Sequence, residues 1–160
     1  MFESRRDLVA LIVFVGICLA VEVIAGRATS ASVKSWYVEL QKPAWTPPGW
    51  LFPPVWTLLY LSMGVAGWLV WQMRDEKSIT LALALFGLQL FLNLIWSVIF
   101  FGLRQTGWGL VDIVLLWLSI AATIGAFLRI RPAAGLLLLP YLAWVSYATA
   151  LNFTIWKLNR

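Results

Sequence analysis

The segment KPAWTPPGWLFPPVWTLLY, residues 42–60, decides how the chain is organised. It holds five prolines and three tryptophans within nineteen residues. Proline fixes φ, removes a backbone donor and disfavours the helical region for the residue before it. Residues 42–49 are therefore predicted to be extended and stiff. Pro53 and Pro54 fit the first turn of a helix, where a missing N–H group costs nothing. The segment thus predicts a rigid aromatic loop leading into a long apolar helix, as a cap would.

The composition of the whole chain indicates a membrane protein. Apolar residues make up 62% of the 160 residues and charged residues 12%, whereas a soluble domain has about 25% charged residues. A membrane-spanning helix needs about 20 apolar residues. Five such spans are predicted at residues 8–26, 50–72, 79–103, 107–128 and 133–156. The predicted fold is one all-α integral membrane domain over residues 1–160. Basic residues divide evenly between the two ends of this bundle, so the positive-inside rule gives no orientation.

Several functional classes are disfavoured by what the chain lacks. It has no histidine, which is the commonest general base and metal ligand, and it shows no nucleophile–base pair or metal-binding cluster. Cys18 is the only cysteine and forms no internal disulfide. The net charge is +5, but the basic residues lie singly in loops, so a nucleic-acid partner is not expected. Any chemical turnover would have to take its reactivity from a bound ligand.

Residues 27–49 form the longest predicted connection. Within them SVKSWYVEL, residues 32–40, predicts a short interfacial helix with Ser32 as its N-cap. The other connections are much shorter. A long aromatic loop beside short ones is typical of a lid or ligand wall. An aromatic belt at the membrane interface explains the same residues, and both interpretations stay open.

Three predicted helices carry aromatic side chains along one face, and two of these faces also carry amides. They comprise Trp56 and Tyr60 in the second helix, Gln89, Asn93, Trp96 and Phe100 in the third, and Tyr141, Trp144, Ala148 and Asn152 in the fifth. In lipid, an amide must find a partner or line a cavity. The faces therefore indicate either hydrogen bonding that holds the bundle together or a shared aromatic pocket for a small molecule.

Three residues inside the predicted spans stand out from their apolar surroundings. Glu22 lies near the end of the first span and Asp112 about one turn into the fourth. Each carboxylate is explained by a helix end or an interface, and together they leave a proton-coupled transporter as a weaker hypothesis. Pro140 is expected to kink the fifth helix and free a carbonyl about one turn earlier.

Four motifs carry a resemblance to a known family. KPAWTPPGW, PPVWTLLY, LNLIWS and PYLAWVSYATALNFTIWKLN follow one another over nearly the whole chain. Together they resemble the translocator protein family, also called tryptophan-rich sensory proteins (TspO) or peripheral benzodiazepine receptors, in its bacterial form. The resemblance implies a homodimer of five-helix bundles in a bacterial cell membrane, with a central pocket beneath the first loop.

The resemblance also implies ligands and site residues. Family members bind protoporphyrin IX and other tetrapyrroles, isoquinoline carboxamide or benzodiazepine ligands, and cholesterol in the animal forms. The family's pocket tryptophans correspond to Trp56 and Trp144, its amide to Asn93 and its pocket alanine to Ala148. The remaining contacts look like Tyr37, Pro47, Tyr60 and Trp96. Protoporphyrin IX is expected as a ligand, and no cofactor or metal is expected.

The animal cholesterol motif is only partly matched. It reads apolar–x–Tyr–x–x–x–basic, and the corresponding residues are Leu151, Phe153 and Lys157, with phenylalanine where tyrosine is expected. Such motifs are weak even when intact, so sterol-like lipids are a doubtful partner.

The expected function is a membrane receptor, sensor or transporter of tetrapyrroles that regulates porphyrin metabolism or a stress response. Aromatic faces suit the porphyrin plate, and Arg27, Lys34 or Lys42 would meet its propionates. Without histidine, metal-free porphyrin is expected to be preferred over haem. The alternatives are a light-dependent porphyrin-degrading enzyme with Trp56 and Trp144 as the photochemical residues, and the proton-coupled transporter.

Overall fold

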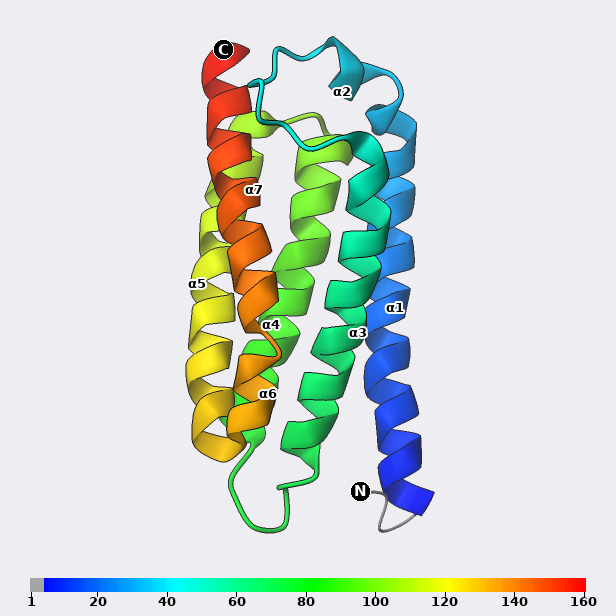
Figure 1. The fold of residues 1–160 in the computed structure, drawn as a ribbon, viewed down its shortest axis with the longest axis vertical. Coiled ribbons are helices and arrows are strands. Elements are labelled where there is room, and N and C mark those ends of the chain that lie inside the picture. Colours follow the sequence, from blue (N-terminus) through cyan, green and yellow to red (C-terminus); the bar gives the residue numbers. More distant parts are fainter. Residues whose placement is uncertain (1–4) are drawn as a thin grey trace.

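The computed structural model describes residues 5–160, which form an elongated bundle of helices (Figure 1). The long helices run along one axis, and the start of α1 and the end of α7 lie at opposite ends of the bundle. The elements are α1 (Arg5–Val33), α2 (Trp36–Glu39), η1 (Gly49–Leu51), α3 (Phe52–Trp71), α4 (Thr80–Ser97), η2 (Val98–Gly102), α5 (Thr106–Ile130), α6 (Pro132–Leu136) and α7 (Leu139–Leu158).

Five segments are long and apolar enough to cross a membrane, as the hydropathy pattern predicted. They are Arg5–Val33, Gly49–Trp71, Thr80–Gly102, Thr106–Ile130 and Pro132–Leu158. The predicted all-α bundle is confirmed, with boundaries that shift by a few residues for most spans. A one-turn π-helix, η2, ends the third span.

The proline-rich segment behaves largely as predicted. Residues 42–48 contain no helix or strand, and Pro53 and Pro54 occupy the first turn of α3. The segment is not extended throughout, because residues 44 and 45 form a turn in which the Thr46 amide donates to the Pro43 carbonyl at 3.1 Å, and Gly49 begins the 3₁₀ turn η1. The prolines thus keep the loop free of helix up to the point where the second span starts, but they do not keep it straight.

The first helix is longer than predicted, and Ser32 is not an N-cap. α1 continues seven residues past 26 to Val33. The hydroxyl of Thr29, inside α1, donates to the Ala25 carbonyl at 2.9 Å, and the hydroxyl of Ser35, two residues past the end of α1, donates to the Ala31 carbonyl at 2.8 Å. Buried Ser32 lies inside α1 and donates to the carbonyl of Phe101 at 2.5 Å. The short interfacial helix exists, but it begins at Trp36.

The fifth span is interrupted where Pro140 predicted a distortion. α6 ends at Leu136 and α7 begins at Leu139, with Pro140 in the first turn of α7. The carbonyl of Leu137, in the break, accepts a hydrogen bond from the Ser62 hydroxyl of α3 at 2.7 Å. Pro140 therefore starts a helix rather than bending one, and the freed backbone oxygen finds its partner on a neighbouring helix.

The helices pack in a closed ring. α1 lies against α3 and α4, α4 against α5, α5 against α6 and α7, and α3 against α6. Gly64 and Gly67 allow the close contact between α1 and α3. A Cβ added at Gly64 would lie 2.7 Å from the Cα of Val15, and one added at Gly67 would lie 2.7 Å from the Phe14 ring. Small residues let neighbouring backbones approach in membrane bundles.

The loop between α1 and α3 crosses the end of the bundle at which the C-terminus lies (Figure 1). It is fastened there by a reciprocal pair of hydrogen bonds. The amide of Gln41 donates to Oδ1 of Asn159 at 2.9 Å, and Nδ2 of Asn159 donates to the Gln41 carbonyl at 2.9 Å. The Tyr147 hydroxyl also donates to the Trp45 carbonyl. The loop is thus attached at two points, to α7 and to the residue just after it.

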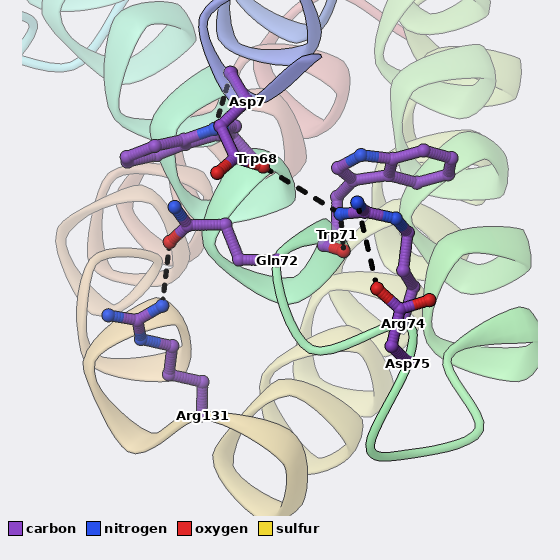
Figure 2. A network of polar contacts seen from close by, with 7 residues as sticks. All are labelled: Asp7, Trp68, Trp71, Gln72, Arg74, Asp75 and Arg131. Atoms are coloured by element: carbon purple, nitrogen blue, oxygen red, sulfur yellow. Dashed lines mark hydrogen bonds and ion pairs between the residues drawn. The ribbon is translucent and has the colours of Figure 1, made fainter. Parts of the chain in front are cut away.

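The opposite end of the bundle is closed by side chains that bridge helix termini (Figure 2). The Trp68 indole donates to the carbonyl of Asp7 at 2.9 Å. Arg131 donates to Oε1 of Gln72 at 2.7 Å, and Lys77 donates to the carbonyl of Ile130 at 2.7 Å. These contacts join α1 to α3, and join the residues that follow α3 to the end of α5.

Candidate functional site

A buried chain of polar side chains joins three helices beneath the loop. The Tyr60 hydroxyl donates to Oδ1 of Asn93 at 2.8 Å. Nδ2 of Asn93 donates to the hydroxyl of Tyr141 at 2.6 Å. All three residues are at most 2% exposed. The carboxamide of Asn93 in α4 therefore bridges α3 and α7 and uses both its acceptor and its donor end.

A second amide makes a parallel bridge nearer the loop. The Trp96 indole of α4 donates to Oδ1 of Asn152 at 3.0 Å. Nδ2 of Asn152 in turn donates to the carbonyl of Thr106, at the start of α5, at 2.8 Å. Because a buried amide without partners is costly in lipid, these bonds fix how α4, α5 and α7 meet.

Aromatic rings of α3 and α7 form two groups in this region, of which one lies against the tyrosine partners of the first amide. The ring of Trp56 lies 5.8 Å from that of Tyr60 and 6.3 Å from that of Tyr141. Trp144 lies 5.8 Å from Phe52 and stacks on Tyr147 at 6.1 Å. Trp56 and Trp144 are both only half-buried. Each therefore keeps part of its aromatic surface uncovered by the chain.

The loop adds a further aromatic wall. Tyr37 of α2 lies 5.5 Å from Phe101 and 6.4 Å from Phe100, and Phe100 stacks on Trp96 at 5.3 Å. Burial raises the pKa of the Tyr37 phenol above its usual value. Lys42 folds over the Tyr37 ring at 4.9 Å and donates to the carbonyls of Tyr37 and Leu40 at 2.7 and 3.0 Å. Its ammonium group thus holds α2 and the segment after it.

Most of the predicted site residues are connected by these contacts. Tyr60, Asn93 and Trp56 belong to the inner cluster. Trp96 and Tyr37 meet through Phe100, and Trp144 is linked to α3 through Phe52. Pro47 is half-buried in the extended part of the loop, and Ala148 packs against the buried core.

Phe100 and Tyr141 lie on the predicted helix faces, but four other aromatic residues of this region were predicted neither on those faces nor as site residues. They are Trp45, Phe52, Phe101 and Tyr147. Tyr147 follows Trp144 by three residues and so continues its helix face, which is the signal that could have found it. The contacts of Trp45 and Phe101 depend on how the loop folds back over the bundle, and helical periodicity carries no information about that.

The carboxylates that suggested proton coupling lie in different surroundings. Glu22 accepts a hydrogen bond from Thr57 across the α1–α3 contact. Asp112 of α5 is 6% exposed, and its Oδ2 has no partner within residues 5–160. No interaction in the described part of the chain links the two residues. Within the same residues, no group of three or more His, Cys, Asp or Glu side chains is placed to hold a metal ion.

The residues of the sterol-like motif do not share a surface. Leu151 is 6% exposed and packs with Phe100 and Phe101, whereas Phe153 is 48% exposed and Lys157 is also exposed. Residues two apart on a helix point about 200° apart. The motif therefore spans the inside and the outside of α7.

Comparison with known proteins agrees with this architecture. The TspO/MBR family model matches residues 14–157. The tryptophan-rich protein TspO of Chlorobaculum tepidum is 46% identical over 163 residues, covering 97% of this chain and 99% of the relative. The translocator protein of Homo sapiens is 46% identical over 127 residues, 78% of this chain and 75% of the relative. The tryptophan-rich sensory protein of Cereibacter sphaeroides is 40% identical over 137 residues, covering 84% of this chain and 85% of the relative. The chain is a multi-pass integral membrane protein and belongs to the TspO/MBR family.

Proposed function

We propose that this protein is a membrane receptor for tetrapyrroles, with protoporphyrin IX as the ligand, and that binding reports porphyrin status to a regulatory or stress response. The observation that carries the proposal is the arrangement of half-buried tryptophans around a buried amide. Trp56 of α3 lies against the rings of Tyr60 and Tyr141, Trp144 follows Tyr141 by three residues in α7, and both tryptophans are only half-buried.

The chemistry of the ligand fits this arrangement. A porphyrin is a wide aromatic plate, and aromatic side chains bind such plates by offset or edge-to-face contact. Small-molecule sites are typically apolar, with a few placed polar groups. Here Asn93 would be the polar group, because ligand contact requires only that one of its two hydrogen bonds be exchanged.

The propionates of the porphyrin need cationic partners at the loop end. Arg27 and Lys34 are exposed there, near the end of α1 and just after it. Lys42 is occupied by the carbonyls of Tyr37 and Leu40. We therefore assign the propionates to Arg27 and Lys34, and expect Lys42 to keep the loop folded around the ligand.

The test is a titration of detergent-purified protein with protoporphyrin IX in the dark, followed by tryptophan quenching. The variants are Trp144→Phe and Asn93→Ala, with Trp108→Phe as the matched control, because Trp108 is 67% exposed on the outer surface of the bundle. An isoquinoline carboxamide competitor separates binding from partition into micelles. Saturable, competable quenching that both site variants weaken and Trp108→Phe preserves supports the proposal. Quenching that does not saturate, or that ignores the site variants, refutes it.

A light-driven reaction of bound porphyrin is the second candidate function. It is favoured by the position of Trp56, whose ring lies close to two buried tyrosines that can pass on an oxidising equivalent. An excited porphyrin would take an electron from the indole, and molecular oxygen would take that electron from the porphyrin radical anion as superoxide. The indole radical cation would then oxidise the porphyrin, and the resulting porphyrin radical cation would combine with superoxide, so that the net reaction adds one O₂ to one porphyrin and restores the indole. This candidate shares the site of the first and differs in the fate of the bound ligand.

A further inference from the structure

A groove lies at the end of the bundle opposite the loop. It has a volume of about 800 Å³ and is formed by the first turns of α1 and the last turn of α3 with the residues after it. Three arginines, Arg5, Arg6 and Arg74, line it together with apolar and aromatic side chains. The groove shares no residue with the aromatic site beneath the loop.

Arg74 is held in a fixed position at the groove (Figure 2). Its guanidinium carbon lies 5.1 Å from the Trp71 ring, and Nη1 donates to the Trp71 carbonyl at 3.2 Å. Nη1 and Nη2 also lie 3.8 and 3.7 Å from carboxylate oxygens of Asp7 and Asp75. A guanidinium group has five N–H donors, so these few long contacts leave donors for an additional oxygen ligand.

Arg5 and Arg6 give the groove its excess positive charge. Both are exposed, and no ion pair within residues 5–160 involves either of them. Of the other basic side chains at this end, Lys77 donates to the Ile130 carbonyl and Arg131 to Gln72, and exposed Arg129 does not line the groove. The three groove arginines outnumber the two aspartates beside Arg74, which suits a ligand with a single negative charge.

The wall below the arginines is apolar. The Phe14 and Trp71 rings lie 6.3 Å apart, and Val9 and Val13 are 54% and 50% exposed. The apolar part of α1 begins directly after Asp7, which places Arg5 and Arg6 at the membrane–water boundary and Val13 and Phe14 within hydrocarbon. Positive charge at the membrane–water boundary, next to uncovered apolar surface within the hydrocarbon, is typical of a phospholipid site between helices.

We propose that this groove binds an anionic phospholipid. Its phosphate accepts hydrogen bonds from Arg5, Arg6 and the unused donors of Arg74, and one acyl chain runs along Val9, Val13 and Phe14. A zwitterionic headgroup carries a cation that meets Arg5 and Arg6 unfavourably, so the site selects for net negative charge. The proposal does not depend on tetrapyrrole binding, because the two sites lie at opposite ends of the bundle.

The test counts lipids bound to the full-length, detergent-purified protein by native mass spectrometry. Dioleoyl phosphatidylglycerol and dioleoyl phosphatidylcholine have the same acyl chains and differ in headgroup charge. The expected result is a preference for phosphatidylglycerol, which falls about tenfold in the double variant Arg5→Gln/Arg6→Gln. The matched control Arg27→Gln/Lys34→Gln removes the same charge at the loop end and is expected to keep the preference.

A second variant tests the apolar wall without changing any charge. Val13→Trp fills the groove from an exposed position of α1, and we expect it to reduce phosphatidylglycerol binding while circular dichroism shows an intact helix content. Equal binding of the two lipids by the unmodified protein would overturn the proposal. So would equal loss in the two charge variants, or displacement of the lipid by millimolar inorganic phosphate.

Discussion

Asn93 donates a hydrogen bond to the hydroxyl of Tyr141 at 2.6 Å, and this contact ties α4 to α7 in the buried centre of the bundle. The same amide accepts from Tyr60 of α3. One side chain therefore sets the separation of three helices and also forms the polar part of the candidate site. Stability and ligand binding are expected to be coupled at this residue.

We expect Asn93→Leu to lower the free energy of unfolding by about 1–2 kcal/mol, because it leaves two buried hydroxyls without partners. Unfolding in a titration with denaturing detergent measures the change. The double variant Asn93→Leu/Tyr60→Phe is the control, since it also removes one of the orphaned hydroxyls. It should lose less stability than the sum of the two single variants. Strict additivity would show that the chain is not energetically connected.

Gly64 and Gly87 provide a matched pair for testing the α1–α3 contact. A Cβ at Gly64 would meet the Val15 backbone, whereas one at Gly87 has nothing within 4 Å. We expect Gly64→Ala to destabilise the protein by about 1–3 kcal/mol through overpacking. Gly87→Ala should be neutral or stabilising by up to about 1 kcal/mol, as helix propensity requires. Similar thermal midpoints for the two variants would contradict the observed packing.

Gln89 is 1% exposed, and neither of its side-chain polar atoms has a hydrogen-bond partner within the described residues. Replacing such a group by an apolar one of similar shape removes its desolvation cost. We expect Gln89→Met to raise the free energy of unfolding by about 1–2 kcal/mol. The same unfolding titration measures it. A clear loss of stability would indicate an internal water bonded to the amide.

Asn159 should control the exposure of the loop. We expect Asn159→Ala to speed hydrogen exchange at the Gln41 amide by about fivefold, since among the bonds it removes are the two to Gln41, worth together about 1 kcal/mol. Hydrogen–deuterium exchange read by mass spectrometry measures this. Lys157→Ala, a change at an exposed position in the last turn of α7, is the control and should exchange at the normal rate. If both variants leave exchange unchanged, the reciprocal pair does not hold the loop.

The light-driven candidate makes a separate prediction. Illumination of bound protoporphyrin IX in air should change its absorption spectrum, and Trp56→Phe should slow the change at saturating ligand. Trp108→Phe serves as the control for light absorbed or quenched by tryptophan in general. Loss of the porphyrin spectrum at the same rate in both variants would refute the light-driven candidate. The receptor function would be untouched by that result, because the dark titration tests it separately.

Sequence reasoning was most accurate where one residue type dictates the backbone. The prolines at 53 and 54 predicted the start of α3, and hydropathy predicted all five spans. The face of Trp56 and Tyr60 and that of Asn93 do converge, since helical spacing reports which side chains share a side. The partners they meet across the bundle were not specified by spacing within any one helix.

The predictions failed where polar side chains had a choice of partner. Ser32 has the chemistry of an N-cap, but α1 continues through it to Val33, and the nearby Thr29 hydroxyl bonds to a carbonyl of the same helix. Ser32 itself bonds to Phe101, 69 residues away in sequence. A local pattern weighs only the nearby alternative, and the more distant carbonyl becomes available once the bundle has assembled.

The Gln41–Asn159 pair makes the attachment of the loop depend on the order of the end of α7. Helix ends fray, and each opening of the last turn of α7 would break the two hydrogen bonds that hold the loop there. The rate at which a ligand enters from water would then be set by how often the final turn of α7 opens, and not by the stiffness of the proline-rich segment.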